Sequence, residues 1–410
     1  MKTPSRLTDV AQERFVGVTA EQELTPSDQF DAVIAEFRNG IDYKKYLPLI
    51  RIIRRKARNV RFISILYKTQ DPSGKEVVAS GILAYPKTGK IRGTIEVSPV
   101  SKELYRAGSV QCFAMEALPS MCGYVVLVPD TIGYGSTQDE VIPILMSENV
   151  ARVAVDFRQA VQEYMASWDT PVELPAKTIC YGYSLGAAGT LCTACYYCAH
   201  PELGVNVHSL FLGGGAYDPW LTLNSAIKDG ECGYLIYPMI ARGLKRWFLP
   251  DLNINNLFQG RVLEDFDFIA DGKSNFTDLA GEYGIDLHTY LHPDFYSPEK
   301  NADINKLMEC LKGLKVSVPK GALPQDLKIF LRHSAEDNYV QVESSDRLYQ
   351  ELRQNGYTNI HYRRKKRGSH YEDAARALIE LFTVVFWHYR TGTSRSTATA
   401  FSGSKNSKES

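Results

Sequence analysis

The chain has 410 residues, 44% of them hydrophobic, and its 47 lysine and arginine residues are balanced by 47 aspartate and glutamate residues. A zero net charge gives no reason to expect nucleic acid or an anionic membrane surface as a partner. No apolar stretch reaches the length of a membrane-spanning helix, so no stable membrane insertion is expected. The length fits one large domain with an insertion, or two domains.

The first residues lack the apolar segment of a signal peptide, which favours a cytoplasmic location. A secreted or periplasmic protein whose leader has been removed is the alternative. Cys192, Cys195 and Cys198 have a spacing found in cluster-binding motifs. They fall inside a predicted helix, however, with no fourth ligand at a suitable spacing. We therefore expect reduced, buried thiols and no metal or cofactor.

Residues 1–60 are predicted to form a polar N-terminal helical extension, in which a short amphipathic helix begins near Ser27. A basic run between Lys44 and Arg61 alternates with aliphatic residues. Such a run is typical of a helix that packs its apolar side on the domain and exposes its charges. A membrane-surface or nucleic-acid patch is the alternative.

From residue 61 onward the pattern predicts strands. Asp71-Pro72-Ser73-Gly74 is a turn sequence between two β-rich runs, so residues 61–85 are expected to form a hairpin. The later strands alternate with helices, which favours a largely parallel sheet covered on both faces. The predicted elements are strands 61–69, 77–85, 92–98, 124–129, 179–183 and 208–213, and helices 102–116, 148–168 and 187–200.

An aromatic, helix-rich region at residues 216–324 interrupts this rhythm, which resumes with strands 327–332 and 359–363 and helices 343–355 and 371–389. We interpret residues 61–217 and 326–390 as one core domain, residues 218–325 as a helical cap insertion, and residues 391–410 as a disordered tail. Helices inserted at this point would lie over the carboxyl edge of the sheet. Packing layers remote from that edge are the alternative.

The most specific motif is Gly182-Tyr183-Ser184-Leu185-Gly186, a G-x-S-x-G sequence between a predicted strand and a predicted helix. A serine on a sharp strand-to-helix turn needs neighbours without a Cβ atom two residues away on either side. The two glycines meet this need. The turn would expose the Ser184 hydroxyl at a helix N-terminus, where it could act as a nucleophile.

A nucleophilic serine needs a histidine base and a carboxylate that orients it. Asp337 follows the strand that ends near residue 332, and we prefer it to the adjacent Glu336 as the acid. His370 lies on the loop between the last strand and the last helix, after the acid in the chain, and is the predicted base. His333 precedes the acid and is interpreted as a structural loop residue.

With these residues placed, the chain resembles the α/β-hydrolase superfamily from about residue 61 to 389. Gly123–Ser136, which contains an Asp-x-x-Gly-Tyr-Gly segment, resembles the secreted lipase and esterase subgroup. Ala79-Ser80-Gly81, Tyr85-Pro86 and Gly213–Asp218 fit the same subgroup. The resemblance implies an α/β-hydrolase fold with a mostly parallel central sheet, helices on both faces, a helical cap insertion, a serine ester hydrolase activity and no cofactor.

The oxyanion hole is expected to use the backbone N–H of Leu185 and that of Val100 or Ser101. Related hydrolases often have His-Gly at the second position, whereas this chain has Pro99, which carries no N–H. Tyr183, Ser98 and Tyr134 are the expected substrate contacts.

A second basic run, residues 363–367, enters the loop that carries His370. It would steer anionic substrates, act on the histidine or simply be solvated, and it also resembles a weak nuclear-localisation run. The sequence as a whole predicts hydrolysis of a small-molecule ester with an apolar group. A serine peptidase of the same fold is one alternative, and a non-catalytic binding protein with a decayed oxyanion hole is the other.

Overall fold

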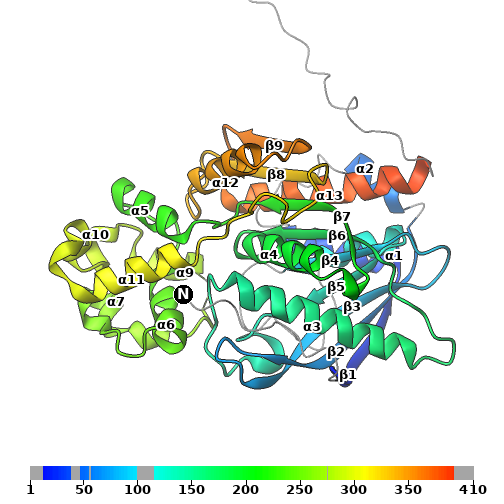
Figure 1. Cartoon of the computed structure of the whole chain (residues 1–410), viewed down its shortest axis with the longest axis horizontal. Coiled ribbons are helices and arrows are strands. Elements are labelled where there is room, and N and C mark those ends of the chain that lie inside the picture. The colour runs from blue at the N-terminus through cyan, green and yellow to red at the C-terminus, as the bar shows by residue number, and fades with distance from the viewer. Residues whose placement is uncertain (1–12, 38–46, 55–56, 99–114, 275, 392–410) are drawn as a thin grey trace, which may run out of the picture.

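The computed structural model describes residues 13–37, 47–54, 57–98, 115–274 and 276–391, and within them a single nine-stranded sheet forms the centre of the molecule (Figure 1). The strand order is β1-β2-β3-β5-β4-β6-β7-β8-β9. The strands are β1 Phe15–Leu24, β2 Val60–Gln70, β3 Glu76–Pro86, β4 Thr94–Ser98, β5 Val125–Pro129, β6 Lys177–Tyr183, β7 Asn206–Gly213, β8 Lys328–Ser334 and β9 Ile360–Lys365.

The sheet is antiparallel from β1 to β5 and parallel from β5 to β9. In the parallel part, Gly182 pairs with Ser98 on one side and with Leu212 on the other. The carboxyl ends of β4, β6 and β7 therefore lie side by side, as the edge that holds ligands in such sheets requires. The predicted mostly parallel sheet with an antiparallel opening is confirmed.

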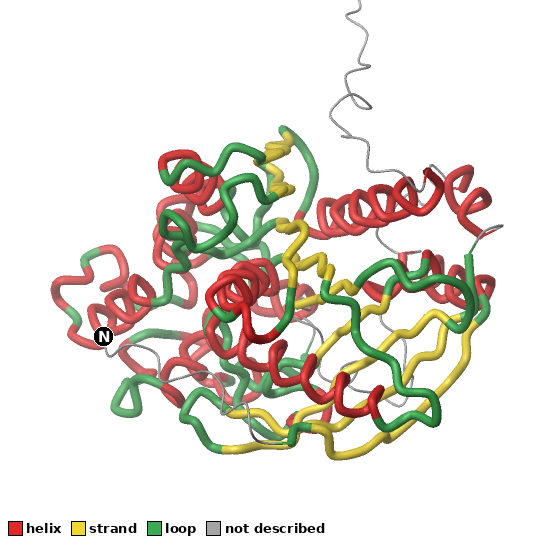
Figure 2. The backbone as a smooth tube through the Cα atoms, turned by 45° about the vertical axis from the view of Figure 1, so that its right-hand side comes forward, coloured by secondary structure: helices red, strands yellow, loops and turns green. Residues whose placement is uncertain are grey.

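Helices cover both faces of this sheet, whose strands twist in Figure 2. Along β6, Ile179 and Tyr181 pack in a core cluster with α13, whereas Cys180 packs in a second cluster with α4. This alternation is the period of two that side chains have along a strand. The core helices are α1 Pro26–Phe37, α2 Leu47–Arg54, α3 Ser147–Ala166, α4 Leu185–Ala199, α12 Glu343–Gln354 and α13 His370–Thr391, with a 3₁₀ segment, η3, at Met115–Cys122.

The N-terminal region differs from its prediction. Residues 15–24 form the edge strand β1 instead of a helical extension, and the Thr19 hydroxyl of β1 donates to Ser64 Oγ of β2 at 2.8 Å. The predicted amphipathic helix follows as α1, where Thr25 and Asp28 cap each other through their side chains and backbone N–H groups. In α2, the Ile53 side chain is buried in the core, as expected for a docked basic helix.

Between β7 and β8 the chain forms a helical insertion, residues 219–313, which gathers at one end of the sheet (Figures 1 and 2). It has its own hydrophobic cluster, which also includes Tyr339 and Val340 of the loop after β8. Its helices are α5 Pro219–Asp229, α6 Tyr237–Trp247, α7 Gly260–Glu264, α8 Phe266–Ile269, α9 Phe276–Tyr283, α10 Leu287–Tyr290 and α11 Ala302–Gly313.

The insertion is joined directly to the loop after β8. The Gly233 N–H donates to the Asn338 carbonyl at 2.9 Å, and the Tyr234 ring stacks on Tyr339 with centroids 4.2 Å apart. A Cβ atom on Gly233 would lie 2.1 Å from Asn338 Nδ2, so the close approach requires glycine. The insertion therefore packs against the same loop that carries Asp337.

The cysteines on α4, Cys192, Cys195 and Cys198, pack against the core cluster between α4 and the sheet, as the sequence predicted. Burial raises the pKa of all three thiols, which keeps them protonated. Among the described residues, none of the helices combines the length and apolarity needed to cross a bilayer. Residues 102–114 of the helix predicted at 102–116, Cys112, and residues 392–410 of the tail predicted at 391–410 lie outside the described residues.

Candidate active site

Ser184 occupies the sharp turn between β6 and α4, as the motif predicted. Its backbone has φ 54° and ψ −127°, a strained conformation for a residue with a Cβ atom. The Ser184 N–H donates to the Gly213 carbonyl of β7 at 2.8 Å, which helps to hold this geometry. The side chain is partly exposed at the start of α4. The structure thus places a partly exposed Ser184 on a strained strand-to-helix turn.

The glycine before the elbow is required by space. A Cβ atom on Gly182 would lie 2.3 Å from Thr190 Oγ1 and 2.4 Å from the Gly186 carbonyl oxygen. On the outer side of α4, a Cβ atom on Gly189 would lie 2.3 Å from the Val150 side chain of α3. The glycine at 182 meets the need that the sequence predicted, and Gly189 in addition lets α4 approach its neighbouring helix α3.

Gly182→Ala is expected to destabilise the protein by about 2–3 kcal/mol, because its methyl group overlaps backbone as well as side-chain atoms. Chemical denaturation of wild type and variant measures the change. Gly281→Ala is the matched control: Gly281 lies in α9 with open space around it, and there alanine is expected to stabilise by about 0.5–1 kcal/mol. Equal stability of Gly182→Ala and wild type would contradict the tight elbow.

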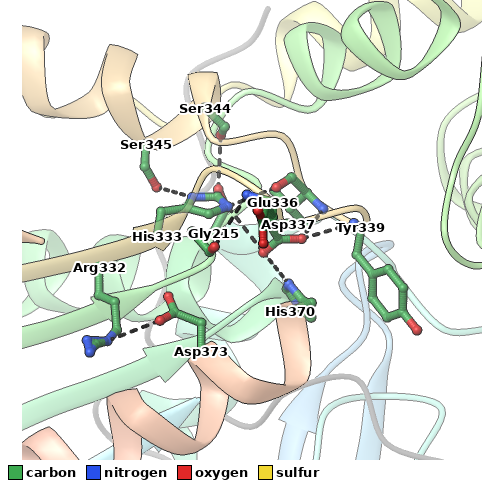
Figure 3. Close-up of polar contacts among 12 residues, drawn as sticks. Gly215, Arg332, His333, Glu336, Asp337, Tyr339, Ser344, Ser345, His370 and Asp373 are labelled. Carbon is green, nitrogen blue, oxygen red and sulfur yellow. Dashed lines mark hydrogen bonds and ion pairs between the residues drawn. The ribbon is translucent and has the colours of Figure 1, made fainter. Parts of the chain in front are cut away.

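Asp337 is the best-connected carboxylate at this edge of the sheet. Its Oδ1 accepts the backbone N–H groups of Tyr339 and Val340, both at 2.9 Å, and its Oδ2 accepts from His370 Nδ1 at 2.6 Å (Figure 3). The adjacent Glu336 points elsewhere and accepts the Gly368 N–H at 3.2 Å. The structure thus pairs His370 with Asp337 rather than with Glu336, as the sequence analysis preferred.

The surroundings of Asp337 keep it ionised. Burial alone would raise the pKa of this carboxyl group, but the charge of His370 and hydrogen bonds from His333 and His370 hold the pKa well below its ordinary value. An ionised carboxylate on Nδ1 fixes the His370 ring with its Nδ1 protonated. Nε2 of that ring is then free to accept a proton.

His370 is the first residue of α13, and the helix start is capped from both sides. The Ser369 N–H donates to Glu372 Oε2, and the Glu372 N–H donates back to Ser369 Oγ, each at 3.3 Å. The ring centroids of Tyr183 and Tyr339 lie 5.0 and 5.2 Å from the centroid of the His370 imidazole. These contacts fix the ring at the sheet edge. Among the described residues Ser184 Oγ has no hydrogen-bond partner, so its contact with His370 is part of the proposal below.

Tyr183 has a role that the sequence analysis did not predict. Its side chain is only 1% exposed and packs against Gly213 and Gly214, where a Cβ atom would collide with the ring. Its hydroxyl donates to the backbone carbonyl of His370 at 2.8 Å. Burial raises the pKa of this phenol well above its ordinary value, so it remains a donor. Tyr183 therefore links the residue before Ser184 to the backbone of His370, and its burial differs from the exposed position that a substrate contact needs.

Tyr183→Phe is expected to lower kcat about tenfold with little change in KM, because a buried carbonyl loses its donor and the base loses its tether. Steady-state kinetics on an ester substrate measures kcat and KM separately. The control is Tyr217→Phe, since the buried Tyr217 hydroxyl has no partner among the described residues and its removal is expected to be neutral. An unchanged kcat in Tyr183→Phe would refute the linking role.

The remaining predicted site residues lie as follows. Leu185 begins α4, where a first-turn N–H is left without a partner inside the helix. Ser98 ends β4 opposite Gly182 and is buried. Tyr134 is buried in the cluster of the helical insertion rather than exposed beside Ser184. Val100, the predicted second oxyanion donor, lies outside the described residues.

A cavity of about 40 Å³ lies between the helical insertion and the loop after β8. Its lining is almost entirely apolar and includes Leu145, Phe258, Tyr339 and Val340. Leu145 has φ 65°, a second strained non-glycine backbone. The cavity thus touches the loop that carries Asp337.

Several solved structures share this architecture. The chain superimposes on a candidate hydrolase from Legionella pneumophila with a TM-score of 0.71 at 18% identity, covering 93% of this chain and 100% of the other. The rice cell wall degrading esterase LipA from Xanthomonas oryzae gives a TM-score of 0.68 at 18% identity, covering 90% and 96%.

Lipase A from Candida antarctica in its closed state gives a TM-score of 0.55 at 13% identity, covering 80% of this chain and 78% of the lipase. No family model and no curated protein matches the sequence. The sheet order, the elbow at Ser184 and these similarities agree with one another. The chain therefore has the α/β-hydrolase fold that these esterases and lipases share.

Proposed function

We propose that the protein is a serine hydrolase that cleaves carboxylic esters through Ser184, His370 and Asp337. The observation that carries the proposal is the hydrogen bond of 2.6 Å between His370 Nδ1 and Asp337 Oδ2, at the same sheet edge as the strained Ser184. Two of the similar structures are an esterase and a lipase, which supports the same class of reaction.

In this mechanism His370 Nε2 takes the hydroxyl proton of Ser184 as the oxygen attacks the ester carbonyl. The C–O bond to the alcohol then breaks, and the imidazolium returns its proton to the departing alcohol. Water repeats the sequence on the acyl-enzyme: His370 takes a proton from water, the acid is released and Ser184 regains its hydrogen. Asp337 stays ionised throughout and stabilises the imidazolium.

The oxyanion of each tetrahedral intermediate needs preorganised N–H donors. The Leu185 N–H fits one such role because it begins α4 directly beside Ser184, where the helix dipole also favours negative charge. We assign the second donor to residue 100 or 101, following the chain order of the fold. With Pro99 excluded as a donor, these are the next N–H groups along the chain.

We assign the helical insertion as a cap that receives the apolar part of the substrate. The apolar cavity between the insertion and residues 339 and 340 supports this assignment. An apolar pocket beside the loop that carries Asp337 favours hydrocarbon groups over charged groups. A peptidase usually also needs a charged site for a peptide end. Among the described residues that line the cavity there is no charged side chain, which favours an ester substrate.

The proposal is tested with nitrophenyl esters of graded acyl length beside aminoacyl anilides. We expect ester turnover that rises with acyl length to an optimum, and at most slow anilide cleavage. Preferred anilide cleavage would make the protein a peptidase of this fold. No turnover of either series, together with no labelling by a fluorophosphonate probe, would overturn the hydrolase proposal in favour of a non-catalytic binding protein.

A further inference from the structure

A second histidine, His333, contacts the proposed catalytic carboxylate from inside the fold. It lies in β8, is fully buried, and its Nε2 is 3.3 Å from Asp337 Oδ2 (Figure 3). This is the same oxygen that accepts from His370 Nδ1. The proposed mechanism gives His333 no task, and its sequence position predicted only a structural residue.

The partners of His333 define which nitrogen carries its proton. Nε2 is 2.8 Å from the Val340 carbonyl oxygen, which can only accept, so Nε2 bears the hydrogen. Nδ1 is 2.7 Å from Ser345 Oγ of α12, whose hydroxyl can donate to it. The ring is thus held in one tautomer, and its single N–H is shared between the Val340 carbonyl and Asp337 Oδ2.

These contacts join His333, Asp337 and Val340 in a ring of hydrogen bonds after β8. Val340 donates its N–H to Asp337 Oδ1 and accepts at its carbonyl from His333, which also faces Asp337 Oδ2. Both oxygens of the Asp337 carboxylate therefore accept hydrogen bonds, and the group cannot rotate without losing several of them at once. With His370, the two oxygens face four donors.

We propose that His333 is a positioning residue for the proposed reaction: it fixes the rotation of the Asp337 carboxylate and limits how strongly Oδ2 binds the His370 ring. The proposal rests on the proposed function of Ser184, Asp337 and His370. It predicts that a hydrogen-bond donor at the Nε2 position of residue 333 affects kcat and its pH dependence through His370. A purely structural residue would affect only the stability of the protein.

Other charged groups near His370 and Asp337 contact partners of their own. Arg332 of β8 faces Asp373 and Glu380 of α13, with 3.5 Å between Arg332 Nε and Asp373 Oδ1. Glu336 faces the Gly368 N–H. Among the described residues, the phenols of residues 183, 339 and 371 lie against the His370 ring. Cys232 and Tyr234 of the insertion are further titratable groups that interact with Asp337. Substitutions at residue 333 leave all of these groups in place.

The test compares His333→Leu, His333→Asn and His333→Gln by pH profiles of kcat and kcat/KM. In His333→Leu the carboxylate loses a donor and binds His370 more strongly, so the acidic limb of the profile is expected to move up by about half a pH unit. kcat is expected to fall five- to tenfold, or about the effect of one hydrogen bond, with KM unchanged. His333→Gln keeps a donor at the Nε2 position and is expected to restore both values.

His333→Asn is the second arm, because its amide is polar but too short to reach Asp337. It is expected to behave like His333→Leu and carries the test if the leucine variant does not fold. An unchanged acidic limb in a folded His333→Asn or His333→Leu variant would overturn the proposal, as would a failure of His333→Gln to restore it.

A readout without substrate separates this inference from the proposed function. The downfield proton NMR signal of His370 Nδ1–H reports its hydrogen bond to Asp337 directly, and it is expected to shift in His333→Leu and His333→Asn but not in His333→Gln. If wild type hydrolyses nothing, the proposed function fails and this signal alone decides the role of His333. If the signal is the same in all variants, His333 does not act on the pair.

Discussion

Ser184→Ala is expected to reduce ester turnover by about 10⁴- to 10⁶-fold and to abolish covalent labelling by a fluorophosphonate. The substitution removes the only protein atom that forms a bond with the acyl carbon in the proposed mechanism. It leaves the backbone at φ 54° with a Cβ atom, as in wild type, so folding is expected to be unchanged. Initial rates with a nitrophenyl ester and intact-mass spectrometry of the labelled protein measure both effects.

Ser167→Ala provides the matched control for this experiment. Ser167 is an exposed serine at the end of α3, whose hydroxyl donates to the Tyr164 carbonyl at 2.7 Å. Its variant is expected to label and to turn over substrate like wild type. Labelling of Ser184→Ala at the wild-type level would show that another nucleophile reacts, and the assignment of Ser184 would be wrong.

Asp337→Asn is expected to lower kcat by about 10⁴-fold. Asp337 Oδ1 already accepts two backbone N–H groups, so the amide oxygen of asparagine is expected to take that place. The amide nitrogen then faces His370 and His333 as a donor. His370 would have to move its proton from Nδ1 to Nε2 to accept from it, and a protonated Nε2 cannot take the Ser184 proton. The pH dependence of kcat, measured beside wild type, checks this result.

The neighbouring carboxylate supplies the control for that substitution. Glu336→Gln changes a residue that accepts the Gly368 N–H and lies beside Arg367, away from His370 Nδ1. Its kcat is expected to stay within a few fold of wild type. Equal losses in the two variants would mean that the acid loop acts only through its overall structure and not through one carboxylate.

The elbow and the parallel strands could be predicted from the sequence because their signals are local. An apolar run, the glycines at 182 and 186 and a helix-like run lie next to one another in the chain, and the observed β6 and α4 follow that pattern. β1 was not predicted, because its apolar residues do not mark a buried side: Val16 and Val18 are exposed at this edge of the sheet. Pairing with β2 stabilises this strand, and no property of residues 15–24 alone reveals that partner.

The site shows the same division between local and distant information. Chain order led to the prediction of Asp337 and His370, because the fold that the motif implies restricts the loops on which an acid and a base can lie. The structure brings these two side chains within 2.6 Å of each other. The role of Tyr183 depends on a carbonyl 187 residues away, so adjacency to Ser184 suggested a substrate contact instead. Tyr134 was misplaced for a related reason: its burial depends on helices that pack on it from the insertion.

The hydrogen bond between the Gly233 N–H and the Asn338 carbonyl limits how the helical insertion can be rearranged. The carbonyl that receives the Gly233 N–H belongs to the residue directly after Asp337, and the next ring along is stacked on Tyr234. A rearranged insertion would therefore pull on the backbone of the acid itself. Changes on helices of the insertion that do not contact Asn338 or Tyr339 would leave that backbone in place.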